Sequence, residues 1–237
     1  MKKISVLCLL VVFCGAGCTV QQINQTIDEY LNGDKLTTEE VTSGLKEALV
    51  QGITNGSNLA SRKDGYFKNS LIKIPFPPDA IKVANTLRDI GLGRQVDRFV
   101  MTLNRGAEDA AKSAKPIFVE AIRQMTIQDA WAILQGENDA ATQYLKRTTS
   151  QSLYGAFKPV IKNSLDKVNA TRYYGDLVTR YNRIPLVERV NPDLDDYATN
   201  LAIDGLFKLI AAEEGKIRED PVARTTALLK KVFGYEG

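Results

Sequence analysis

Three aspartates near the end of the chain are the residues whose types and spacing best suit chemistry. Asp193, Asp195 and Asp196 lie within the run 191–197. Carboxylate oxygens are the ligands that a hard cation such as calcium prefers, so the cluster suggests a cation or polar-ligand site. The run lacks the glycine and the distal glutamate of a calcium loop. Helix capping, with aspartates stabilised at the positive end of the helix dipole, is the simpler interpretation, and we expect no metal site.

A second polar group lies at residues 138–146. Asp139, Thr142 and Tyr144 supply one carboxylate and two hydroxyl groups there. At helical spacing Asp139 and Thr142 would share a face, which suits a polar ligand. The alternative is the solvated beginning of a helix, where such pairs are routine.

Two adjacent pairs of residues allow a functional and a structural interpretation. Tyr173 and Tyr174 are typical of a platform that stacks on sugars, although aromatic residues at helical spacing more often belong to a core. Glu213 and Glu214 precede two basic residues, and this pattern predicts a charged, exposed helix face.

The composition limits the reactions that are open to the chain. Its 237 residues include no histidine and three cysteines. This excludes a Ser-His-Asp or Cys-His site and any histidine-bound metal within the chain. Glycoside cleavage by two carboxylates stays open, with Asp139, Asp193, Asp195 and Asp196 as the candidates. No glycine-rich phosphate loop is present, and we expect no cofactor.

All three cysteines lie in an amino-terminal segment that is typical of an export signal. Two lysines precede an apolar run over residues 4–13, which is too short to span a bilayer. The small residues before Cys18 resemble the lipobox of bacterial lipoproteins, with glycine at position 15 in place of the usual leucine. Cleavage would remove the signal peptide, residues 1–17, and Cys18 would be lipidated. An ordinary signal peptide that releases a free protein is the alternative.

Processing changes the charge and predicts a location. Removal of residues 1–17 takes away two lysines and no acid, so the formal net charge falls from +3 to +1. A near-neutral chain gives no reason to expect a nucleic-acid partner. Acyl chains on Cys18 would hold the protein at a membrane surface. Thr19 replaces the aspartate of the common inner-membrane retention signal, which favours an outer-membrane lipoprotein that faces the periplasm.

The hydrophobic pattern after the signal predicts an all-α protein, an irregular bundle of several helices. Residues 18–36 are expected to form a tether or short helix, and residues 37–237 a single helical domain. Prolines at the end of residues 61–78 predict an extended arm or a short edge strand that lies over the helices.

Local signals predict where several helices begin and end. Capping boxes open helices at Thr37 and Thr126. Glycine and polar residues should end the first helix near residues 55–57. Pro159 is expected to interrupt a long helix, and Asn191 to cap the helix that follows, with proline at its first position.

Several short runs, in one order over residues 40–234, resemble the domain of unknown function 4197 family of exported bacterial proteins. They lie at residues 64–67 (Asp-Gly-Tyr-Phe), 72–75, 138–145, 191–197, 204–207 and 217–234. The resemblance implies a mostly helical periplasmic domain, often behind a signal peptide or lipobox, and it implies no reaction. It also adds Asp64 to the candidate residues.

The candidate polar ligand site therefore consists of Asp64, Asp139, Thr142, Tyr144, Asp193, Asp195 and Asp196. Our first hypothesis is a non-enzymatic envelope module that binds a partner protein, a glycan or a small ligand. A carboxylate-dependent periplasmic hydrolase is one alternative. The other is a helical carrier of an apolar ligand, which requires an apolar cavity of at least about 300 Å³.

Overall fold

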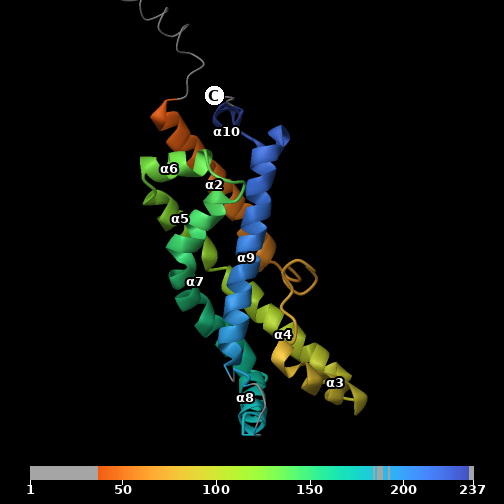
Figure 1. The fold of residues 1–237 in the computed structure, drawn as a ribbon. Coiled ribbons are helices and arrows are strands. Elements are labelled where there is room, and N and C mark those ends of the chain that lie inside the picture. Colours follow the sequence, from red (N-terminus) through yellow and green to blue (C-terminus); the bar gives the residue numbers. More distant parts are fainter. Residues whose placement is uncertain (1–36, 184, 186–188, 192, 235–237) are drawn as a thin grey trace, which may run out of the picture. The chain divides into compact units, whose positions relative to one another are not determined.

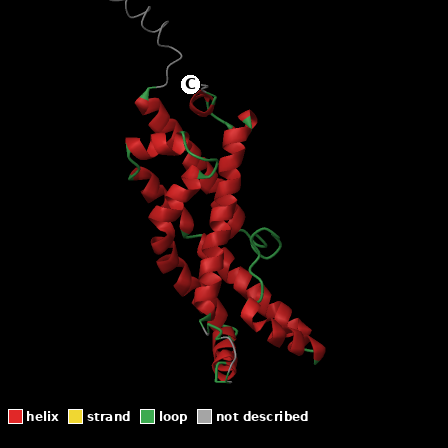
Figure 2. Ribbon diagram, in the orientation of Figure 1, coloured by secondary structure: helices red, strands yellow, loops and turns green. Residues whose placement is uncertain are grey.

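The computed structural model describes residues 37–183, 185, 189–191 and 193–234, and every regular element within them is helical (Figures 1 and 2). The predicted all-α class is confirmed. The predicted signal peptide, Cys18 and the predicted tether lie outside the described residues. Among the helices that are described, none has both the length and the apolar character needed to cross a bilayer.

The helices follow one another closely along the chain. They are α2 (Thr38–Ser61), η1 (Pro78–Ala80), α3 (Ile81–Asp89), α4 (Gly93–Ala111), α5 (Ala114–Arg123), α6 (Ile127–Leu134), α7 (Ala140–Asp166), α8 (Ala170–Tyr181), α9 (Leu194–Glu219), η2 (Pro221–Ala223) and α10 (Ala227–Phe233).

Four long helices, α2, α4, α7 and α9, enclose most of the core. Helix α7 packs against both α4 and α9, and α2 packs against α9 (Figure 1). Tyr66, Phe118 and Phe157 are the largest fully buried side chains. Each buried side chain of this size stabilises the fold by about 1.5–3 kcal/mol relative to its exposed state. Shorter helices complete the bundle, with α5 and α6 against α2 and α7.

Both predicted capping boxes are present. The Thr37 hydroxyl accepts a hydrogen bond from the Glu40 N–H (3.1 Å), and the Glu40 carboxylate accepts one from the Thr37 N–H (2.9 Å). Thr126 and Asp129 make the same reciprocal pair at the start of α6. These contacts satisfy backbone donors that the first helical turn leaves free.

The predicted end of the first helix near residues 55–57 is wrong, because α2 continues to Ser61. Gly52 and Gly56 face α9, and a Cβ on Gly56 would lie 3.2 Å from Ile210. The absence of a side chain therefore lets the two helices approach closely. Packing between them outweighs the helix propensity lost at a glycine, about 1 kcal/mol.

Two further boundary predictions are also wrong. Helix α7 runs through Pro159 without ending, since it buries Phe157 and Ile161 on either side of the proline. Packing of this face offsets the backbone hydrogen bond that the proline removes. Asp193, and not Asn191, caps α9, and the Asn191 side chain instead accepts a bond from the Asp193 N–H (2.9 Å).

Residues 62–77 form the predicted non-helical arm, without a strand. Buried Asn104 on α4 accepts a hydrogen bond from the Ile74 N–H and donates one to the Ile74 carbonyl, both at 2.8 Å. The Asn104 amide thus satisfies both backbone groups of Ile74, as a neighbouring strand would. The buried Tyr66 hydroxyl donates to the Ala202 carbonyl of α9 (2.6 Å). Side chains of α4 and α9 therefore fix the path of the arm.

Candidate functional site

Two of the three clustered aspartates contact α7, and one of them, Asp193, also caps α9. Asp193 accepts a hydrogen bond from the Asp196 N–H (2.8 Å) and forms an ion pair with Lys158 (3.0 Å). Asp196 accepts a bond from the Tyr154 hydroxyl. Burial opposes the charge on Asp193, but the bonds from the Asp196 N–H and from Lys158 lower its pKa overall. These contacts join the start of α9 to the middle of α7.

Asp195 is buried, with 6% of its surface exposed. It accepts a hydrogen bond from the Thr171 hydroxyl (3.2 Å) and lies 3.7 Å from the Lys162 ammonium. Burial raises the pKa of Asp195, although Lys162 acts in the other direction. In the described part of the chain, no group of acidic or cysteine side chains is arranged to hold a metal ion. The carboxylates are thus balanced by two lysines.

Asp195→Asn is expected to raise the free energy of unfolding at neutral pH, by less than about 1 kcal/mol. The folded-state pKa lies above the unfolded value, so the fold penalises the ionised carboxylate above the folded pKa. The penalty, and therefore the gain, disappears as the pH falls below about 4. Urea unfolding across this range measures it, with Asp176→Asn on the exposed surface of α8 as the control. A loss of stability at neutral pH would contradict the prediction.

Asp139 and Tyr144 do not meet in one site. Asp139 accepts a hydrogen bond from the Gln143 amide on the surface (2.8 Å). The buried Tyr144 hydroxyl donates to the Ala121 carbonyl (3.1 Å). Tyr144 also lines a hollow of about 450 Å³ between α5 and α7, whose lining contains one carboxylate, that of Glu120. The hollow therefore lacks the carboxyl pair that glycoside hydrolysis requires.

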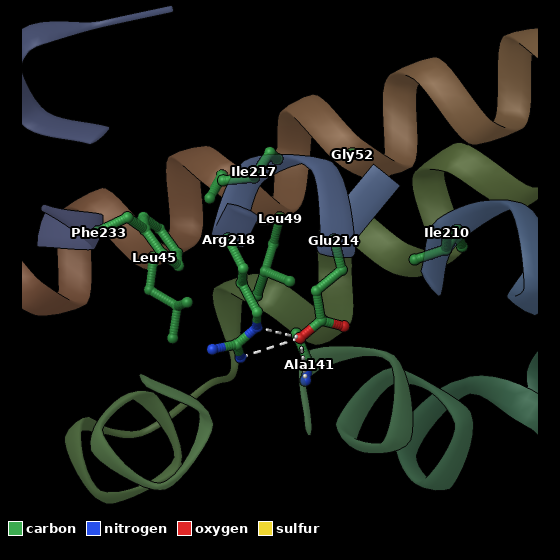
Figure 3. A pocket seen from close by; sticks show the side chains of 10 residues that line it. Leu45, Leu49, Gly52, Ala141, Ile210, Glu214, Ile217, Arg218 and Phe233 are labelled. Atoms are coloured by element: carbon green, nitrogen blue, oxygen red, sulfur yellow. Dashed lines mark hydrogen bonds and ion pairs between the residues drawn. The ribbon is translucent and has the colours of Figure 1, made fainter. Parts of the chain in front are cut away.

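Thr142 belongs to a buried polar contact between α7 and α9. The Glu214 carboxylate accepts hydrogen bonds from the Ala141 N–H (3.0 Å), the Thr142 N–H (2.9 Å) and the Thr142 hydroxyl (2.8 Å). Arg218 pairs with the same carboxylate (3.0 Å), as Figure 3 shows. It also donates to the Ile133 carbonyl of α6 (2.8 Å). A side chain of α9 thus caps α7, where negative charge is favoured.

The predicted exposed face around Glu213 and Glu214 is therefore wrong for Glu214. Its side chain is 8% exposed, and that of Arg218 is 12% exposed. Because its partners on α7 are distant in sequence, the local charge pattern does not reveal the burial. The cavity beside this pair has a volume of about 20 Å³, room for about one water molecule and not for an organic ligand.

Asp64 also serves the fold. It lies in the left-handed region (φ 67°) and pairs with Lys68 (3.0 Å) and Arg105 (2.5 Å), whose hydrogen bonds lower the Asp64 pKa. Arg105 pairs in turn with buried Glu108 (2.5 Å). Glu108 accepts bonds from two backbone N–H groups of the arm, both at 3.2 Å. This network fastens the beginning of the arm to α4.

A different part of the molecule has the shape of a ligand site. Helices α3, α4 and α8, with the end of the arm, enclose an open groove of about 380 Å³. This volume lies within the usual range of small-molecule sites. Its apolar and aromatic lining consists of Phe76, Val83, Leu87, Val96, Phe99, Val168, Ala170, Tyr173 and Tyr174. The ring centroids of Phe76 and Phe99 are 4.8 Å apart.

Few polar groups border this groove. Of the residues that the structure describes, its lining contains Gln95, Arg98 and Thr102 of α4 and no acidic side chain. Tyr174 is 5% exposed, while Tyr173 beside it is 69% exposed. Burial, followed by the charge of Asp79, raises the pKa of the Tyr174 hydroxyl to about 12, so this group stays a neutral donor.

The groove is not predicted by the sequence pattern. Apolar spacing around Phe99 indicates only that one helix face is buried, and it does not show against what. The adjacent pair Tyr173 and Tyr174 is the one signal in the sequence that could have indicated the groove. Neighbouring positions on a helix point in different directions, so two adjacent aromatic residues cannot both be buried on one face. Phe76 could not be linked to them, since it reaches the groove through the path of the arm.

Fold and site together define a helical domain with an aromatic-lined groove. The predicted polar residues lie outside this groove and act in caps, ion pairs and hydrogen bonds of the fold. The family model described as protein of unknown function (DUF4197) matches residues 35–234. The chain belongs to this family, as the sequence runs predict. No curated protein and no solved structure matched the chain.

Proposed function

We propose that this protein is a non-enzymatic binding module that holds an apolar small ligand in the groove between α3, α4 and α8. The proposal rests on the volume and the lining of the groove, about 380 Å³ with nine apolar or aromatic side chains among twelve. Concave sites of this kind, with few polar groups, are typical of small-molecule binding. Two of the initial hypotheses, a binding module and an apolar carrier, are thereby combined.

The exposure of an aromatic side chain at the groove supports the proposal that a ligand binds there. Tyr173 is 69% exposed and Val168 is 44% exposed at the edge of the groove. A ligand that covers these side chains would remove apolar surface from water, which contributes about 25 cal/mol per Å². Phe76 and Phe99, whose rings are tilted by 41° to each other, provide an aromatic wall for the same ligand.

The hydrolase hypothesis receives no such support. Asp193, Asp195 and Asp196 are engaged with the lysines and hydroxyls of α7 and α8. Asp139 accepts a hydrogen bond from the Gln143 amide on the surface. The aromatic groove has no carboxylate in its lining, so no acid and base face each other there.

A neutral apolar fluorophore, N-phenyl-1-naphthylamine, tests the proposal. We expect saturable binding to the purified protein at one site. Val83→Trp places a larger side chain in the groove and should weaken binding by about tenfold or more. Ile127→Trp is the matched control, because Ile127 is 53% exposed on α6 and lies outside the groove lining. Circular dichroism shows whether each variant keeps its helices. Equal affinity in the wild type and Val83→Trp would overturn the proposal.

We propose further that the module is an envelope lipoprotein, anchored through Cys18 to the outer membrane and facing the periplasm. The apolar run 4–13, the small residues before Cys18, and Thr19 after it support this location. The unknown ligand, protein or glycan would then be met in the cell envelope.

Cys18→Ser is expected to move the protein from the membrane fraction to the soluble fraction of the cell envelope. Without the thiol no acyl chain can be attached, and each methylene removed from the bilayer costs about 0.8 kcal/mol of membrane affinity. Immunoblots of fractionated cells measure the shift, and Ser5→Ala within the apolar run is the control. A wild-type protein that is already soluble would refute the anchor.

A further inference from the structure

We infer that the ligand of the groove is an anionic amphiphile, a free long-chain carboxylate whose head group pairs with Arg98. This inference rests on the proposed function, since it names the chemical class of ligand for the same groove. Among the described residues that line the groove, Arg98 is the one charged side chain, against a mainly apolar and aromatic surface. Such a combination fits a hydrocarbon chain with one acidic end.

Arg98 is an exposed arginine of α4 that borders the groove, whereas two other arginines of α3 and α4 are paired with carboxylates. Arg88 pairs with Asp97 (2.6 Å), and Arg105 pairs with Asp64 and Glu108 (2.5 Å each). Among the described residues, the Arg98 guanidinium makes no ion pair or hydrogen bond. It therefore offers a planar set of donors that matches a carboxylate.

Tyr174 places one more polar group in the lining of the groove. It lines the groove, is 5% exposed, and its hydroxyl has no hydrogen-bond partner within the described part of the chain. In the described ranges of the chain, the buried side-chain polar atoms without a partner are those of Ser57 and Thr199, so the Tyr174 hydroxyl is open to solvent and can donate to a ligand oxygen in place of water. Asp79 acts electrostatically on Tyr174 but is not part of the lining, so Arg98 remains the one full charge that borders the groove.

Three amphiphiles with the same chain and different heads test this inference: dodecanoate, dodecan-1-ol and dodecyltrimethylammonium. The affinity of each is measured by its displacement of bound N-phenyl-1-naphthylamine from the purified protein, at concentrations where the amphiphile is monomeric. We expect dodecanoate to bind about tenfold more tightly than dodecan-1-ol, and the cation to bind most weakly. Added salt should reduce the differences in affinity among the three amphiphiles, because the head group lies at the open side of the groove.

Arg98→Gln should make dodecanoate and dodecan-1-ol equivalent while the neutral fluorophore still binds. Arg94→Gln, an exposed arginine of α4 outside the groove lining, is the matched control and should keep the preference. A wild type without preference for the anion would overturn the inference and leave the proposed function intact. Failure of the fluorophore to bind would overturn both. Binding to phosphatidylglycerol vesicles but not to dodecanoate would assign the groove to a membrane surface and also overturn the inference.

Discussion

Glu214→Ala is expected to lower the free energy of unfolding by about 3–5 kcal/mol. The substitution leaves the largely buried Arg218 without its carboxylate partner. It also removes the acceptor for the Ala141 and Thr142 N–H groups at the start of α7. Both effects act in the same direction, since an unpaired buried charge and an uncapped helix each destabilise the fold. Equilibrium unfolding in urea measures the change.

Two further variants separate the charge from the general effect of truncation. Glu219→Ala, at the exposed end of the same helix, should change stability by no more than about 0.5 kcal/mol. Glu214→Leu combined with Arg218→Met removes both charges and should recover most of the loss, apart from about 1 kcal/mol for the missing cap. If Glu214→Ala costs less than about 1 kcal/mol, the carboxylate does not have the role that its contacts indicate.

Asn104→Ala is expected to cost about 2–4 kcal/mol and to weaken ligand binding several-fold. The side chain is fully buried and satisfies both backbone groups of Ile74. Without it the Ile74 N–H and carbonyl are left without partners inside the core. Phe76 follows two residues later in the arm and lines the groove, so loosening of Ile74 should disturb the aromatic wall.

The two consequences of Asn104→Ala call for two measurements. Urea unfolding reports the stability, and titration with N-phenyl-1-naphthylamine reports the groove. Asn163→Ala, an exposed asparagine of α7, is the matched control and should leave both nearly unchanged. An arm that tolerates the loss of Asn104 without either effect would show that other contacts hold it in place.

Local signals allowed much of the helical order to be predicted. Thr37 and Thr126 open helices because each capping box joins residues three positions apart, a distance that the sequence displays directly. Pro75 and Pro77 likewise exclude a helix through the end of the arm by their own geometry. Where a local signal conflicts with packing, as at Gly56 and Pro159, the packing determines the helix.

The candidate site could be predicted much less well, for a related physical reason. The residues of the groove come from the arm and from three helices, and periodicity shows only which face of each helix is apolar. The same is true of Glu214, whose partners Ala141 and Thr142 are 73 and 72 positions away. Polar runs attract attention in a sequence, and here the fold uses them as caps and ion pairs.

The direction in which these buried bonds run along the chain has a consequence for how the protein is made. Tyr66 finds its acceptor on Ala202, 136 positions later, and Thr142 finds its own on Glu214. The chain is synthesised from its amino end. The hydroxyl groups of Tyr66 and Thr142 therefore stay bonded to water until α9 has been synthesised. Closing such long loops costs entropy before any bond forms. The bundle should therefore complete its core only after residues 194–219 exist, and truncation before them should leave all of the earlier helices incompletely packed.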